Sequence, residues 1–166
     1  MLAMGIDPGT ATTGYGLVRR DEAGNLTAVD WGVILTAPVE NASERLARIH
    51  KELEKLLKKH NPECAAVESL FFQRNVRTAM SVGQARGVVL LALQQAGIPS
   101  YDYNPNQVKQ AVSGYGAADK RQMQSMVQTL LRLPDLPKPD DAADALAIAI
   151  CHLNTHRTQQ AIASAS

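Results

Sequence analysis

Cysteine and aromatic residues are scarce in this sequence, and long hydrophobic runs are missing. Its 166 residues include two cysteines, Cys64 and Cys151, which show neither Cys-x-x-Cys nor Cys/His spacing. A disulfide scaffold and a structural zinc site are therefore not expected. No apolar run approaches the roughly 18 residues that cross a bilayer, and the first residues, MLAMGIDPGT, lack the basic start of a secretory signal. We expect a cytoplasmic protein with reduced thiols that does not associate with a membrane.

The sequence also has almost no excess of charge, although its charges are unevenly spread. The formal net charge is +1, from 17 Lys and Arg against 16 Asp and Glu. Residues 1–68 carry a net −2, residues 69–133 a net +5 and residues 134–166 a net −2. A basic centre between acidic ends fits a polyanion-binding site with embedded metal-binding carboxylates. A solvated helical face rich in Lys and Arg explains the same distribution equally well.

Hydrophobic periodicity predicts one α/β domain over residues 1–154 and a polar, flexible tail over residues 155–166. Apolar runs predict strands, the first three as an antiparallel meander, over residues 2–6, 14–20, 26–35, 64–67 and 98–103. Helical spacing, with Ser43 and Asn106 as N-caps, predicts helices over residues 43–60, 75–96, 106–112, about 123–131 and 140–154. This order is typical of a three-layer fold with a mixed five-stranded sheet flanked by helices.

Two acidic residues stand at the ends of predicted strands. Asp7 follows the first strand in the motif GIDPG, and Glu68 follows the short apolar strand 64–67. Ligands collect at strand ends of α/β sheets, and a charge at the end of a buried strand must be paired, solvated or metal-bound. Taken singly, each residue is equally well explained as a solvated or locally hydrogen-bonded turn residue.

Three more acids gather at the start of the last predicted helix. Asp141 and Asp144 are three apart and Asp140 and Asp144 are four apart, so spacing alone does not choose between Asp140 and Asp141. Three acids exceed what a helix cap needs, and the alanines around them leave room for a substrate. Together with Asp7 and Glu68, such oxygen ligands suit Mg²⁺ or Mn²⁺. Two divalent ions would balance four carboxylates and admit a phosphodiester for in-line hydrolysis.

Five motifs follow one another along the chain: GIDPGT with TGYG at 5–16, VE at 67–68, GQARG at 83–87, QVKQ at 107–110 and DAADALAIAI at 141–150. In this order and spacing, the chain from Met4 to about Leu153 resembles the RuvC-type Holliday-junction resolvases, the crossover junction endodeoxyribonucleases of bacteria. The resemblance implies an RNase H-like fold, a homodimer, and Mg²⁺-dependent paired nicking of four-way DNA junctions in recombination and repair. It also implies a RuvAB branch-migration complex as partner, and it assigns the acidic tetrad to Asp7, Glu68, Asp141 and Asp144.

The same resemblance points to DNA-binding side chains around this tetrad. The family carries a functional aromatic at the position of Phe71, with Phe72 beside it. An exposed aromatic ring can stack on an unpaired base or wedge a junction open, although one of the two can instead fill the core. Lys109 and Lys120 match basic positions near the family's active site, where they suit phosphate neutralisation and, for Lys120, charge stabilisation in catalysis. Further phosphate contacts are expected from Arg74 and Arg77.

Two other functions are compatible with parts of the sequence. Actin-like and sugar-kinase-like ATPases also use an Asp-x-Gly-Thr phosphate loop, as at 7–10, but those folds need two such domains. The sequence shows no second loop of this kind and no GxxxxGK[ST] motif. A non-catalytic junction-binding module is disfavoured because four bare carboxylates would repel DNA.

Small residues recur at helical spacing in the long helix predicted over 75–96. Ala79, Gly83 and Gly87 lie four apart and form a smooth stripe that permits close approach of another backbone. A four-way junction has approximate two-fold symmetry, so an isologous dimer supplies two matching sites. We expect the stripe to form that dimer interface, with packing on the chain's own sheet as the alternative.

Overall fold

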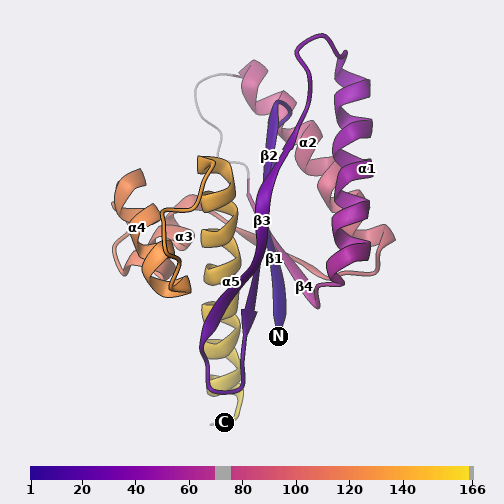
Figure 1. The fold of residues 1–166 in the computed structure, drawn as a ribbon. Coiled ribbons are helices and arrows are strands. Elements are labelled where there is room, and N and C mark those ends of the chain that lie inside the picture. The colour runs from indigo at the N-terminus through magenta and orange to yellow at the C-terminus, as the bar shows by residue number, and fades with distance from the viewer. Residues whose placement is uncertain (70–75, 165–166) are drawn as a thin grey trace.

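A five-stranded mixed sheet organises the protein (Figure 1). The structure, a computed structural model, describes residues 1–69 and 76–164, with side chains over 1–69 and 79–156. The strands lie in the order β3-β2-β1-β4-β5, with β1–β2 and β2–β3 antiparallel and β1–β4 and β4–β5 parallel. They span β1 Leu2–Asp7, β2 Thr12–Arg20, β3 Leu26–Leu35, β4 Cys64–Glu68 and β5 Ser100–Tyr103. The predicted mixed sheet is confirmed.

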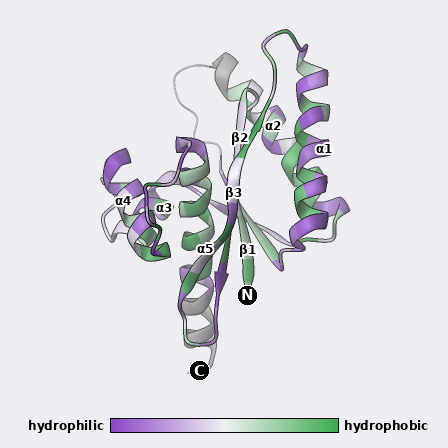
Figure 2. Ribbon diagram, in the orientation of Figure 1, coloured by the Kyte–Doolittle hydropathy of each residue, from purple (hydrophilic) through white to green (hydrophobic). Residues whose placement is uncertain are grey.

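Helices cover both faces of the sheet and complete the three layers (Figure 1). One face carries α1 and α2 over a core that includes Ile49, Leu53 and Val89. The other carries α3, α4 and α5 over a core that includes Val108, Val127 and Leu146. Figure 2 shows the apolar side of α1 turned toward the sheet and its polar side turned outward. The helices span α1 Ala42–His60, α2 Val76–Gln95, α3 Pro105–Ser113, α4 Lys120–Leu131 and α5 Asp140–Ser164. None of the helices in the described part of the chain has the length and apolar character needed to span a membrane.

The helix caps differ from those expected. Asn41, not Ser43, caps α1: its side chain accepts the Glu44 N–H, and the Glu44 carboxylate accepts the Asn41 N–H in return. Asn104, not Asn106, caps α3 by the same reciprocal arrangement with Gln107. A capping box satisfies two backbone donors at once and needs an acceptor side chain three residues after the cap, which decides both starts.

The last helix runs to Ser164, whereas the sequence predicted its end at Asn154. No proline or glycine follows Asn154, so nothing in the chain stops the helix there. The flexibility expected for residues 155–166 stays a prediction.

Helix α5 lies unusually close to the sheet because three glycines face it. A Cβ at Gly5 would lie 1.9 Å from the Ala145 carbonyl oxygen, and one at Gly14 would lie 2.0 Å from that of Asp141. A Cβ at Gly16 would lie 2.7 Å from the Leu146 nitrogen. On the helix side the contact is made by alanines that are fully buried, among them Ala142, Ala145 and Ala149. These three alanines therefore bring the helix and sheet backbones together, and the room expected for a substrate beside the acids lies at Ala147, which lines a cavity together with Asp144.

Candidate active site

Three elements deliver acidic side chains to one edge of the sheet. Asp7 and Glu68 end β1 and β4, which are parallel neighbours, so both reach the same edge. Asp141 and Asp144 lie in the first turns of α5. In the β1–β2 register Asp7 is opposite Gly14, and Gly14 is the glycine against which the Asp141 backbone packs. The missing side chain at Gly14 therefore positions the start of α5 beside Asp7.

The carboxylates act strongly on one another. Burial, followed by the charges of Glu68, Asp144 and Asp141, raises the pKa of Asp7 to about 7. Burial and the Asp144 charge also raise the pKa of Glu68, and a hydrogen bond from Asp7 opposes this rise. With this pKa Asp7 is protonated at acidic pH and loses its proton around neutral pH, and while protonated it donates a hydrogen bond to the Glu68 carboxylate. Burial raises the pKa of Asp144 as well, against the opposing charge of Lys120.

The three acids of α5 have different surroundings. Asp140 is exposed, with Lys120 Nζ 3.0 Å from its Oδ2 and Gln124 Nε2 donating to its Oδ1 at 2.8 Å. These contacts, led by the Lys120 hydrogen bond, lower the pKa of Asp140. Asp144 is 3.9 Å from Lys120 Nζ, and Asp141 acts on Asp7 through its charge. Asp140 therefore has its own ion pair, while Asp141 and Asp144 take part in the field around Asp7.

A cavity of about 270 Å³ opens beside these side chains. Asp7, Glu68 and Asp144 contribute acidic groups to its wall, and Lys109 and Lys120 contribute cations. Asp141 is not among the lining residues. Val108 and Met123 add apolar surface from α3 and α4. The cavity thus presents several carboxylates and two cations to one volume that is open to solvent.

The donor set fits a hard divalent cation. Its ligands are carboxylate oxygens, without thiolate or imidazole among the cavity's lining residues, which suits Mg²⁺ or Mn²⁺. The raised pKa values of Asp7, Glu68 and Asp144 show a site short of positive charge. Within the described residues, no three Asp, Glu, His or Cys side chains are already placed so that they could hold a metal ion.

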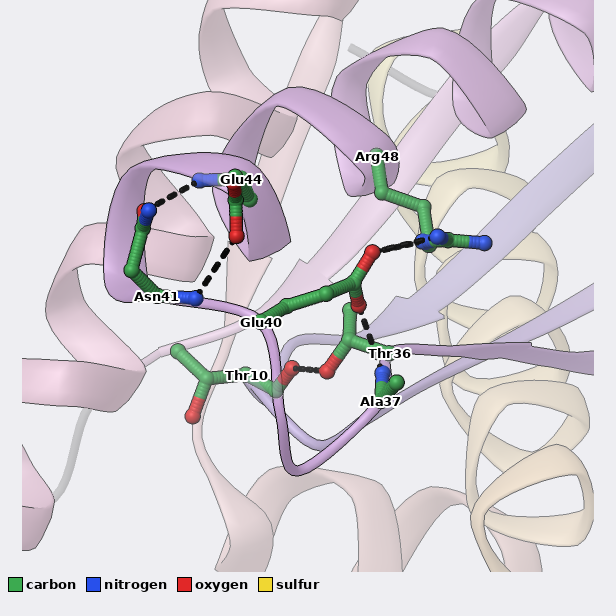
Figure 3. Close-up of polar contacts among 7 residues, drawn as sticks. All are labelled: Thr10, Thr36, Ala37, Glu40, Asn41, Glu44 and Arg48. Carbon is green, nitrogen blue, oxygen red and sulfur yellow. Dashed lines mark hydrogen bonds and ion pairs between the residues drawn. The ribbon is translucent and has the colours of Figure 1, made fainter.

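Side chains away from the acids hold the turn that follows Asp7. The fully buried Thr13 hydroxyl donates to the Gly9 carbonyl at 2.7 Å. The Thr36 hydroxyl donates to the Thr10 carbonyl at 2.7 Å, and Figure 3 shows this contact beside the start of α1. There Glu40 accepts the Ala37 N–H at 2.6 Å and pairs with Arg48. The turn after Asp7 is thereby tied to the β3–α1 connection.

Sequence reasoning named some site residues that the structure does not place, and it missed others. Phe71, Phe72 and Arg74 lie outside the described residues, and Arg77 lies in α2 with its side chain outside them. The missed residues are Gly5, Gly14 and Gly16, which set the distance between α5 and the sheet. The sequence feature by which they were identifiable is the alternation of glycine at 14 and 16, together with an alanine-rich helix later in the chain.

Comparisons with known proteins agree with this geometry. The family model described as "Crossover junction endodeoxyribonuclease RuvC" matches residues 3–152. The RuvC of Roseiflexus sp. (strain RS-1) is 58% identical over 149 residues, which cover 90% of this chain and 88% of that protein. The RuvC of Chloroflexus aggregans is 58% identical over 160 residues, which cover 96% and 97%.

The fold agrees with a solved structure of the same family. The structure of Thermus thermophilus RuvC in complex with Holliday junction substrate is similar, with a TM-score of 0.91 and 42% identity. The match covers 96% of both chains. The family model spans most of the chain, a relative shares 58% sequence identity with it, and acidic residues end the strands of its RNase H-like sheet. The chain therefore belongs to the RuvC family of crossover junction endodeoxyribonucleases.

Proposed function

We propose that this protein resolves four-way DNA junctions by paired, symmetric nicks, through metal-dependent hydrolysis of phosphodiesters. The observation that carries the proposal is the pair of half-buried carboxyl groups at the ends of β1 and β4, where desolvation and neighbouring charges raise the pKa of Asp7 to about 7, next to a cavity lined by two lysines. The Thermus thermophilus relative, whose structure contains Holliday junction substrate, supports the choice of DNA substrate. The reaction belongs to recombination and repair in the cytoplasm.

The family depends on divalent metal ions. In this chain, two Mg²⁺ ions, or Mn²⁺ in their place, would be held by Asp7, Glu68, Asp141 and Asp144. When bound, such a pair activates a water and stabilises the leaving 3′ oxygen of an in-line displacement. Burial and mutual repulsion raise the pKa values of Asp7 and Glu68, and the positive charge of a bound cation would lower them, so both residues would hold it as carboxylates.

The lysines of the cavity act on the phosphate. Lys120 lies 3.9 Å from Asp144 and 3.0 Å from Asp140, so its ammonium is held beside the acids from α4. The hydrogen bond to Asp140 raises the pKa of Lys120, which keeps this group positively charged. Lys109 reaches the same cavity from α3. Both neutralise the phosphate that enters, and Lys120 stabilises charge that develops on it.

The segment that follows Glu68 supplies the contacts to the junction. Phe71 opens the junction by stacking on a base at its centre, with Phe72 assisting, and Arg74 and Arg77 contact phosphates. The position of these residues directly after an active-site carboxylate supports this assignment. The RuvAB branch-migration complex is the partner that delivers junctions.

A second copy of this chain is the partner that makes the cuts symmetric. Gly87 of the small-residue stripe is exposed, and a Cβ there would meet nothing within 4 Å. Met80 and Leu91, seven and four residues away, are 64% and 51% exposed, whereas Ala85 and Val89 on the opposite side of α2 are buried against the sheet. This arrangement favours a dimer interface on the stripe over packing on the chain's own sheet.

Nicking of a mobile four-way junction, with and without Mg²⁺ or Mn²⁺, tests the proposal. We expect two symmetric nicks that need the metal and little cutting of a linear duplex with the same sequence. Equal cutting of junction and duplex would remove the resolvase function and leave a general nuclease.

A further inference from the structure

The loop between α3 and α4 carries an exposed tyrosine on a backbone that is held in place. The Ser113 hydroxyl lies 2.8 Å from the carbonyl oxygens of Lys109 and Tyr115 and accepts the Tyr115 N–H at 3.2 Å. The Gln110 side chain donates to the Gly114 carbonyl at 3.1 Å, and the Ala118 N–H donates to the Tyr115 carbonyl at 3.2 Å. Gly114, with φ of 71°, makes the left-handed turn that ends α3. The loop is thus fastened to the end of α3, and the Ala118–Tyr115 bond closes a turn within it.

The side chain of Tyr115 lies largely in solvent, although its backbone is held in place. Its residue is 64% exposed, and no described residue hydrogen-bonds its hydroxyl. An aromatic ring of this size normally buries most of its surface, so the chain keeps an apolar face in water at this position. Because the backbone beneath the ring is already held in place, a partner that covers the ring restricts few additional rotatable bonds. Binding therefore costs little conformational entropy.

The loop adjoins the active-site cavity at both ends. Lys109, whose carbonyl contacts Ser113, lines the cavity, and so does Ala118, whose N–H bonds to Tyr115. Asp119 and Lys120 continue that wall. The backbone of Tyr115 is therefore bonded to Ala118 at the cavity wall, on the loop that joins the helices carrying Lys109 and Lys120. A flat apolar ring beside cations is the combination that recognises a nucleobase attached to a phosphate backbone.

We propose that Tyr115 is a DNA-binding residue that stacks on an unpaired base next to the phosphate held in the cavity. The proposal rests on the proposed function, because a four-way junction offers bases that lose a stacking neighbour at its centre. It adds a second contact to bases, supplied by α3–α4, to the one assigned to Phe71 after β4. Tyr115 would orient the strand, while Lys109 and Lys120 hold its phosphate.

The test is junction binding by Tyr115→Ala and Tyr115→Phe in an Asp7→Asn background, which blocks cutting. A junction carrying 2-aminopurine beside the cut site reports stacking directly. We expect Tyr115→Ala to bind the junction roughly 5- to 150-fold more weakly and to lose the fluorescence quench, the range that stacking of one base gives. Tyr115→Phe keeps the ring and should stay within about twofold of the parent. Tyr101→Ala is the matched control, because Tyr101 is 43% exposed but its ring already packs on His152, and it lies on β5 rather than on the α3–α4 loop.

Unchanged affinity and fluorescence in Tyr115→Ala would overturn the proposal. Equal loss in the Phe and Ala variants would place the effect in the hydroxyl and also overturn stacking. Equal loss on a linear duplex would exclude an unpaired base as the contact. Wild-type protein that binds the junction but never cuts it refutes the proposed function instead, and the Tyr115 comparison remains readable.

Discussion

Placing one methyl group at Gly14 should damage both the fold and the active site. A Cβ at this position would lie 2.0 Å from the Asp141 carbonyl oxygen, 2.6 Å from its carbonyl carbon and 3.2 Å from its Cβ. Ordinary contacts begin near 3.4 Å, so the start of α5 must move by more than an ångström. The obstacle is backbone, which cannot rotate away as a side chain can.

The cost follows from the size of that movement. Overpacking of this kind costs about 3 kcal/mol of unfolding free energy, the upper part of the usual range, because neither strand nor helix backbone yields easily. In a protein of this length that corresponds to a fall in Tm of roughly 6–12 °C. Moving Asp141 and Asp144 by about 1 Å relative to Asp7 should lower nicking on the order of 100-fold.

The assays are urea unfolding and single-turnover junction nicking, with Gly14→Ala kept well below its Tm. Gly116→Ala is the control, since a Cβ there would lie 3.7 Å from the end of the Gln110 side chain, an ordinary contact. There the loss of glycine flexibility in the unfolded chain should raise the unfolding free energy by about 0.4–1 kcal/mol. A Gly14→Ala protein with wild-type stability and full activity would refute the idea that this glycine sets the position of α5.

Four further predictions concern the acids, pH, the aromatic segment and the dimer. Neutralising a member of the tetrad, by Asp7→Asn, Glu68→Gln, Asp141→Asn or Asp144→Asn, should abolish cutting and spare junction binding. Asp140→Asn should keep most activity. Gel assays of cutting and of junction binding measure the two effects. The pKa of Asp7 is raised from 3.8 to about 7 in the fold, so without metal the folded state binds the extra proton and stability should fall as pH rises from 4 to 7. Thermal melts of the wild type and Asp7→Asn test this, since the variant should have a smaller slope, left by the raised pKa values of Glu68 and Asp144, and Mg²⁺ should offset the slope of the wild type. Phe71→Ala should lower cleavage of intact junctions at least tenfold and recover on a pre-opened junction; equal loss on both substrates would indicate a core role. Gly87→Leu should sediment as a folded monomer and lose paired cutting; a folded dimer would place the interface elsewhere.

Local pattern was enough to predict most elements of this fold. Apolar runs and helical spacing are properties of neighbouring residues, and they predicted β3 at its observed bounds, Leu26–Leu35, and the mixed order of strands and helices. Acids at the ends of predicted strands drew attention to Asp7 and Glu68 for the same reason. The predicted N-caps were wrong because reciprocal hydrogen bonds with residues three positions later select Asn41 and Asn104 as the caps. These paired bonds outweigh the preference of a single residue type for the cap position.

Contacts between distant segments were decided only by the tertiary structure. Spacing left Asp140 and Asp141 equivalent. In the fold, Asp140 forms an ion pair with Lys120 and a hydrogen bond with Gln124, both on α4, whereas the Asp141 backbone packs on Gly14 of β2. Likewise, the alanines of α5 suggested open space beside the acids, but only the fold separates Ala147, which lines the cavity, from Ala145 and Ala149, whose backbones pack on Gly5. Periodicity in the sequence shows which face of a helix or strand is apolar. How closely two such faces approach depends on which residues meet, here glycines on the strands and alanines on the helix, and only the fold brings those residues together.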